Sequence, residues 1–274
     1  MAEWLFRILK GALTGVGAIL PGISGGVLMV VLGIYKPVMA FLAHPIKTFA
    51  KQWPFLLPVL IGWAIGFLGL ARVVEWLFTV SQAPATWLFI GLIVGTLPSL
   101  FHEAGEQGRP TGAWVSLCAS ALLMGGLLWL LSSQGANAVT PNVWWWLVCG
   151  ALWGLGFIVP GLSPSSFFLF FGLYQPMTAA LSHLDMAVVL PMLIGLAATV
   201  VLLVRGMNLL LKRAYPIVMH AILGIVLAST LAILPLDAPA ALGDIALYAL
   251  CFVLGLALAL GMDVLGKRLQ PAAQ

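Results

Sequence analysis

The segment Pro21–Tyr35, PGISGGVLMVVLGIY, returns in the middle of the chain as Pro160–Tyr174, PGLSPSSFFLFFGLY. When Gly11 is aligned with Gly150, positions 11–44 and 150–183 carry the same residue at 15 of 34 places without a gap. Ordered matches of proline, glycine and tyrosine are much rarer by chance than matches of leucine or alanine. The chain therefore contains an internal duplication, and such a repeat bears on the whole fold.

The duplicated unit extends well beyond this segment. A slightly smaller offset aligns Arg72 with Arg205, and it also pairs prolines, glycines and a cysteine in the same order. The smaller offset means that the loop after the repeated segment is shorter in the second copy. We place the first repeat at residues 1–139 and the second at residues 140–274, within a single membrane domain.

The composition indicates that this chain folds in lipid. Hydrophobic residues make up 62% of its 274 residues and charged residues only 7%, whereas about a quarter of a soluble domain is charged. A membrane-crossing helix takes about 20 apolar residues, so the chain has room for about six crossings. We therefore expect an all-α polytopic membrane protein.

Three long apolar runs follow each copy of the repeated segment. Each run is long enough for one membrane-crossing helix once tilt is allowed. We therefore expect three transmembrane helices in each repeat. The six runs are Phe55–Val80, Thr86–Leu100, Trp114–Leu131, Val188–Leu211, Ile217–Leu234 and Asp244–Met262.

The arms of each repeated segment are shorter than these runs. Residues 11–20 and 23–35 reach only about 15–20 Å at about 1.5 Å per residue, which is less than the thickness of the bilayer core. This length favours a re-entrant helical hairpin that dips into the membrane and returns. The arm Val143–Val159 is longer, so a hairpin that spans the membrane remains the alternative.

An odd number of crossings in each repeat inverts the second repeat relative to the first. Inverted repeats with interrupted helices are the architecture of secondary transporters. The positive-inside rule supports this topology with both termini in the cytoplasm, because 10 of the 12 basic residues then face the cytoplasm. These ten are Arg7, Lys10, Lys36, Lys47, Lys51, Arg109, Lys212, Arg213, Lys267 and Arg268.

The two hairpin tips carry the groups expected of an anion site. Proline ends the entering arm and glycine allows the turn at Pro21-Gly22 and at Pro160-Gly161. The next arm begins with free backbone N–H groups, which attract anions. The alternative is a tight bend whose serines only cap the second arm. The hydroxyl donors near the tips are Ser24, Ser163, Ser165 and Ser166.

Arg72 and Arg205 are the two basic residues inside predicted crossings. Inversion places Arg72 toward the outer leaflet and Arg205 toward the inner one. An arginine inside a membrane is costly and by default marks a functional site, and its planar fork suits phosphate. The alternative is that both side chains snorkel to the headgroups and only anchor their helices.

Other polar residues give weaker signals. Tyr35 and Tyr174 end the second arms, where aromatic belt anchoring is the ordinary explanation and a ligand role is the alternative. Glu75 lies one helical turn from Arg72 and is expected to pair with it. The three cysteines have no metal or disulfide spacing. We expect no metal, cofactor, enzyme motif or nucleic-acid surface.

The doubled Pro-Gly-x-Ser…Gly-x-Tyr pattern resembles the PopT family of bacterial membrane proteins, which is associated with polyprenyl-phosphate translocation. The resemblance implies a transporter, not an enzyme, that returns undecaprenyl phosphate from the outer to the inner leaflet of the cytoplasmic (inner) membrane. By the family's pattern, Ser24, Gly25, Gly26, Ser163 and Ser165 would lie near the phosphate. The chain departs from that pattern at Pro164, where the family usually has glycine.

The sequence leaves several functions in competition with lipid transport. The expected partners are the bilayer and a polyprenyl-phosphate lipid moved by alternating access, and a homo-oligomer is left open. A second transporter hypothesis is a carrier of a small water-soluble anion. A membrane-embedded lipid phosphatase and a scaffold are the hypotheses from other classes.

Overall fold

The computed structural model describes residues 2–20, 29, 32–34, 37–38, 41, 45–133, 139–158, 164–236, 238 and 241–269. These residues form helices and turns, with no β-strand among them. The all-α prediction is therefore confirmed. The helices are α1 (Ala2–Ile19), α4 (Pro45–Val80), α5 (Gln82–Ala104), α6 (Thr111–Ser133), α7 (Val143–Ile158), α8 (Ser165–Phe170), α9 (Tyr174–Ser182), α10 (Met186–Ala232) and α11 (Leu242–Leu269).

Within the described residues, six helical segments are long and apolar enough to cross a membrane by length and composition. Each overlaps one of the six predicted runs, which confirms a multi-pass membrane protein. Each segment begins before its predicted run, and three of the six also end a few residues after it. They are Gln52–Val80, Gln82–Ala104, Thr111–Ser133, Met186–Val204, Leu209–Ala232 and Leu242–Val264.

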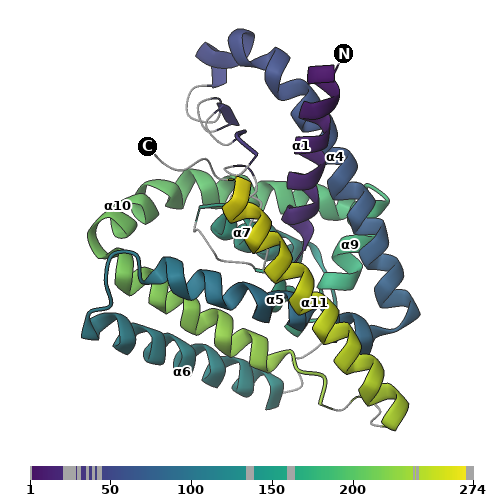
Figure 1. Ribbon diagram of the computed structural model, residues 1–274, viewed down its shortest axis with the longest axis vertical. Coiled ribbons are helices and arrows are strands. Elements are labelled where there is room, and N and C mark those ends of the chain that lie inside the picture. The colour runs from purple at the N-terminus through teal and green to yellow at the C-terminus, as the bar shows by residue number, and fades with distance from the viewer. Residues whose placement is uncertain are drawn as a thin grey trace.

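Helix α10 contains two of these segments. It turns back on itself (Figure 1), and Ala214 inside it has non-helical dihedral angles, with φ −142° and ψ 38°. Pro216 follows closely and has no backbone N–H to continue the helical ladder. Lys212 and Arg213 lie beside the bend. The bend falls between the two runs that the sequence predicted as separate crossings.

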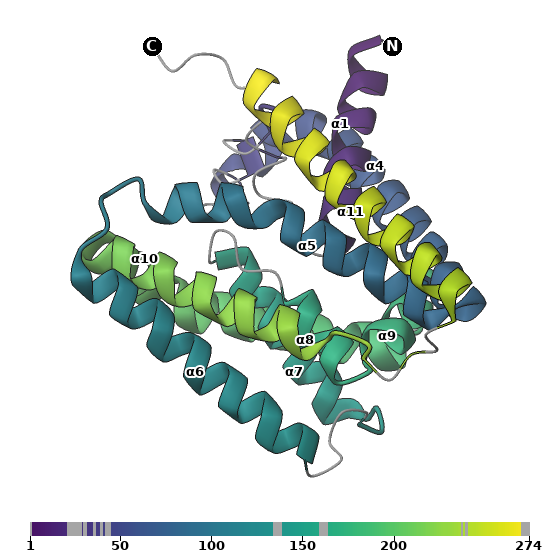
Figure 2. The ribbon, with the colours of Figure 1, turned by 60° about the horizontal axis from the view of Figure 1, so that its bottom comes forward.

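Glycines let α1 and α4 lie in backbone contact. A Cβ added to Gly11 would collide with the carbonyl oxygen of Val59, and one added to Gly62 would collide with that of Ile8. Such close approach between membrane helices favours small residues. The two helices run side by side in both views (Figures 1 and 2).

The pair α7 and α10 repeats this contact. A Cβ on Gly150 would collide with the carbonyl oxygen of Met192, and one on Gly195 with that of Leu147. All four positions are the counterparts of those in the α1–α4 contact when the two repeats are aligned. Helix α7 thus packs on α10 in the same register in which α1 packs on α4.

The long helices that follow pack across the two halves of the chain. Gly91 of α5 lies against the carbonyl oxygen of Phe252 in α11, and Gly224 of α10 lies against that of Leu117 in α6. Helix α11 therefore packs on a helix of the first half, and α6 packs on a helix of the second (Figure 2). These contacts join described helices from the first half of the chain to helices from the second half.

Two turns of the same kind lie near the ends of the repeated segments. Gly172 has φ 67° and Gly33 has φ 72°, a conformation that glycine adopts without a Cβ penalty. The N–H of Leu173 donates to the carbonyl of Phe168 at 2.8 Å, and the N–H of Ile34 donates to that of Met29 at 2.9 Å. This six-to-one bond is the mark of a Schellman turn. The positive φ of this turn therefore explains why glycine stands at the first position of each Gly-x-Tyr sequence.

The hairpin tips themselves lie outside the described residues. The predicted positions affected are Pro21, Gly22, Ser24, Gly25, Gly26, Tyr35, Pro160, Gly161 and Ser163. The re-entrant hairpins and the inverted topology therefore stay predictions.

Candidate functional site

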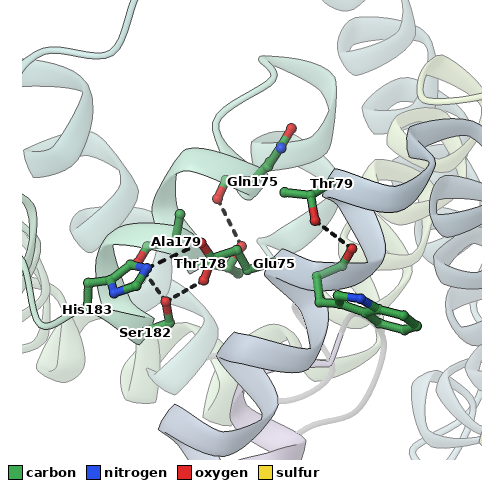
Figure 3. Close-up of polar contacts among 8 residues, drawn as sticks. Glu75, Thr79, Gln175, Thr178, Ala179, Ser182 and His183 are labelled. Carbon is green, nitrogen blue, oxygen red and sulfur yellow. Dashed lines mark hydrogen bonds and ion pairs between the residues drawn. The ribbon is translucent and has the colours of Figure 1, made fainter.

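Glu75 lies at the centre of a polar cluster between α4 and the end of α9. Its carboxylate accepts a hydrogen bond from the Ser182 hydroxyl, with 2.5 Å between Oγ and Oε2. Its other oxygen, Oε1, lies 3.4 Å from Nε2 of His183. Figure 3 shows both contacts reaching from α4 to α9. The cluster therefore ties together two helices that are far apart in sequence.

A shallow, open cavity of about 360 Å³ lies beside this cluster. Arg72, Glu75, Trp76 and Thr79 share one face of α4, because residues three or four apart lie on the same side of a helix. His183 completes the lining. Arg72 and His183 are exposed, whereas the Glu75 side chain is only 24% exposed. The cavity thus combines one guanidinium, one carboxylate and one imidazole.

The expected pairing of Glu75 with Arg72 is wrong. Within the described residues no ion pair joins them, and the carboxylate of Glu75 turns toward Ser182 and His183 instead. The reason is that α9 packs on α4 and brings its own donors to Glu75. Arg72 lies at the rim of the same cavity. The side chain of Arg205 lies outside the described atoms, although its backbone belongs to α10.

Ser165 and Ser166 are the first two residues of α8. Both side chains are buried, with 4% and 2% of their surface exposed. Pro164 precedes them with φ −74° and ψ −5°, and its carbonyl accepts the N–H of Phe167 at 3.0 Å. The helix therefore starts directly after Pro164. The structure brings these two predicted site residues together in the interior.

Tyr174 is not a belt anchor. Only 1% of its surface is exposed, and its hydroxyl donates to the carbonyl of Ile19 at 2.7 Å. Its ring packs against Phe78 and Phe89, with ring centroids 5.8 Å and 5.4 Å away. Tyr174 lies inside because α9 packs against α4. There the tyrosine hydroxyl meets the end of α1.

A second cavity, of about 450 Å³, lies near Tyr174. Its polar lining includes Gln82, Thr86 and Gln175, and no charged side chain among the described residues lines it. Sequence reasoning gave these residues no role, nor did it connect Ser182 or His183 with Glu75. The only sequence signal for His183 is its match with His44 in the alignment of the two repeats.

The comparisons with known proteins agree on one family. A family model described as VCA0040-like, undecaprenyl phosphate translocase-like, matches residues 1–104 and 43–243. The chain belongs to this family. The family assignment confirms the resemblance to polyprenyl-phosphate translocating proteins that the doubled motif indicated.

Two relatives carry the name polyprenyl-phosphate transporter. The relative from Vibrio cholerae serotype O1 is 24% identical over 241 residues, which cover 83% of this translocase-like chain and 76% of the relative. The relative from Staphylococcus aureus is 24% identical over 188 residues, which cover 66% of each chain. No solved structure gives a significant match to this chain.

Proposed function

We propose that this chain moves polyprenyl phosphate, with undecaprenyl phosphate as the expected substrate, from the outer to the inner leaflet of the bacterial cytoplasmic membrane. The observation that carries the proposal is the family match over most of the chain, together with two relatives named as transporters of this lipid class. The six apolar segments supply the membrane body that such a role needs. The proposed process makes and breaks no covalent bond.

The proposed architecture is two inverted repeats, each a re-entrant hairpin and three transmembrane helices, with both termini in the cytoplasm. The matched registers of the α1–α4 and α7–α10 contacts support a duplicated unit. Inverted repeats commonly carry substrate at their interface and expose it to one side at a time. Alternating access of this kind suits a lipid, because only the headgroup needs a polar path.

The proposed phosphate ligands lie at the hairpin tips and on the following helices. Helices α1 and α4 run in the same direction, since Gly11 meets Val59 and Gly15 meets Trp63. Ile19, at the end of α1, shares a core cluster with Ala71. The first tip is therefore proposed to begin at the depth of Arg72. The full set is Ser24, Gly25, Gly26, Arg72, Ser163, Ser165, Ser166 and Arg205, with Glu75, Tyr35 and Tyr174 as secondary candidates.

Translocation in reconstituted vesicles tests this function. Purified protein is placed in vesicles with labelled polyprenyl phosphate, and the label accessible from each side is followed over time. We expect faster exchange between leaflets than in protein-free vesicles. Equal rates in the two preparations would defeat the proposal.

Two further readouts separate the competing functions. Competition by soluble anions with no movement of the lipid would favour the small-anion carrier. Release of inorganic phosphate from the lipid pyrophosphate would favour a lipid phosphatase. In cells, deletion of the gene, with redundant transporters removed, is expected to raise outer-leaflet undecaprenyl phosphate. Unchanged exposure would contradict the proposed direction.

A further inference from the structure

We propose that Glu75, Ser182 and His183 form a proton-binding site that links inward movement of the phosphate lipid to the uptake of one proton. The inference rests on the proposed function and names the ion that drives it. It starts from the polar cluster on α4 and α9 (Figure 3).

The hydrogen bonds of Ser182 suit both protonation states of Glu75. A serine hydroxyl donates one proton and accepts others. The Ser182 oxygen lies within hydrogen-bonding distance of two acceptors, the Glu75 carboxylate and the carbonyl of Ala179, the latter at 2.9 Å. When Glu75 is ionised, Ser182 donates to it. When Glu75 is protonated, its O–H donates to Ser182, which turns its own proton to Ala179. No heavy atom has to move.

His183 gives the pair a route to water. Its side chain is 70% exposed, while its Nε2 lies 3.4 Å from Glu75. An imidazole can accept a proton at one ring nitrogen and release one from the other. A proton taken from solution by His183 can therefore pass to the half-buried carboxylate without crossing apolar surface.

The charge count in the cavity explains why the proton and the phosphate belong together. With Arg72 charged, Glu75 ionised and His183 neutral, the three groups sum to zero. One added proton raises the sum to +1, which favours a phosphate monoester and removes the repulsion between its oxygens and the Glu75 carboxylate. An inside-negative membrane potential opposes inward movement of an anion, and each proton carried along cancels one charge.

Among the described side chains, the other charged groups near the helices that pack on α4 and α9 lie away from Glu75. Helix α9 carries no charged residue, and Asp185, which follows it, caps α10 by accepting the N–H of Ala187. On α1, Arg7 reaches Pro54 at the opposite end of α4. On α5, His102 and Glu103 occupy the last turn, far from its contact with the end of α4. Within the part of the chain whose side chains the structure describes, Arg72 and His183 are therefore the charged or titratable groups that share the cavity with Glu75.

Vesicles with an imposed pH gradient test the proposal. The protein exchanges labelled polyprenyl phosphate, and the steady-state distribution between leaflets is measured with and without one pH unit of gradient, acidic on the entry side. Coupling to one proton shifts that distribution about tenfold. The variant Glu75→Gln cannot take up the proton, so the gradient should leave its distribution of lipid between leaflets unchanged, a ratio of about one. The matched control Glu106→Gln, exposed in the turn after α5, keeps the tenfold shift.

His183→Gln, with His102→Gln as its exposed control, gives a second pair. We expect His183→Gln to reduce the shift several-fold and His102→Gln to leave it intact. For any variant that moves no lipid, binding of polyprenyl phosphate in detergent is measured against pH. The unaltered protein should bind more tightly as pH falls, and Glu75→Gln should bind independently of pH.

Two results overturn the inference and a third overturns the proposed function instead. The inference fails if the unaltered protein moves the lipid with a distribution that ignores the gradient. It also fails if Glu75→Gln responds to the gradient, or to pH in binding, like the unaltered protein. If the unaltered protein moves no lipid under any gradient, the transport proposal is the one that fails.

Discussion

The hydroxyl of Tyr174 donates a hydrogen bond of 2.7 Å to the backbone carbonyl of Ile19, which lies 155 residues earlier in the chain. Ile19 is the last residue of α1, and Tyr174 is the first of α9. The final carbonyls of a helix have no partner inside the helix. The bond therefore caps α1 with a side chain from the other half of the protein, two residues before the predicted hairpin tip at Pro21-Gly22.

Tyr174→Phe removes this hydrogen bond and keeps the ring. The carbonyl of Ile19, a residue only 2% exposed, then loses its donor, which costs about 1–3 kcal/mol. We expect a lower midpoint of thermal unfolding in detergent. The control is Tyr248→Phe, whose ring stacks on Trp87 in α11's contact with α5, and it should change the midpoint little. Equal midpoints for Tyr174→Phe and the unaltered protein would contradict the assigned role.

Gly62→Ala tests the backbone contact between α1 and α4. The added methyl group would collide with the carbonyl of Ile8, so the helices must separate, at a cost of about 1–3 kcal/mol. Gly69 lies on the same helix with open space around its Cβ position. Gly69→Ala should therefore keep or raise stability, since alanine favours a helix over glycine by about 1 kcal/mol. Unfolding midpoints in detergent compare the two. The prediction is wrong if both variants respond alike.

Gly172→Ala tests the turn that follows α8. At φ 67° a Cβ costs about 1–2 kcal/mol, and the turn carries the bond from Leu173 to Phe168. Asparagine tolerates this conformation better than alanine, so Gly172→Asn should lose less stability than Gly172→Ala. Gly126→Ala, in an ordinary helical conformation with open space around it, is the control. A Gly172→Ala variant as stable as Gly172→Asn would argue against the turn geometry.

Arg72→Ala tests the proposed phosphate ligand at the rim of the cavity. Loss of the guanidinium should slow translocation of labelled polyprenyl phosphate at least tenfold, because a charged hydrogen bond contributes about 1.5–3 kcal/mol. Arg72→Lys keeps the charge without the planar fork, so its translocation rate should fall between those of Arg72→Ala and the unaltered protein. Arg109→Ala, exposed in the loop after α5, serves as the control. Normal transport by well-folded Arg72→Ala would favour snorkelling or a scaffold.

The crossings could be predicted because their signal is local. Long apolar runs between turns specify helices whatever their partners are, and the bend at Ala214 falls in the short segment between two such runs, next to Pro216. The duplication was equally visible, since it depends only on the order of residues. The hairpin tips were predicted in the same way, and their geometry stays a prediction.

The partners of these helices could not be predicted from the sequence. In lipid both faces of a helix are apolar, so no amphipathic pattern marks the face that meets protein. Glycines such as Gly91 and Gly224 indicate close contact, but they do not say with which helix. Nothing local indicated that α11 packs on α5 and α6 on α10.

The sequence by itself thus determined an all-helical membrane protein built from two copies of one unit. Only the tertiary structure decided that Glu75 turns from Arg72 to Ser182 and His183. It also decided that Tyr174 is buried against Ile19. The physical reason is that composition and helix length act within a segment. A buried carboxylate or hydroxyl, by contrast, must find its partner in whichever helix packs beside it.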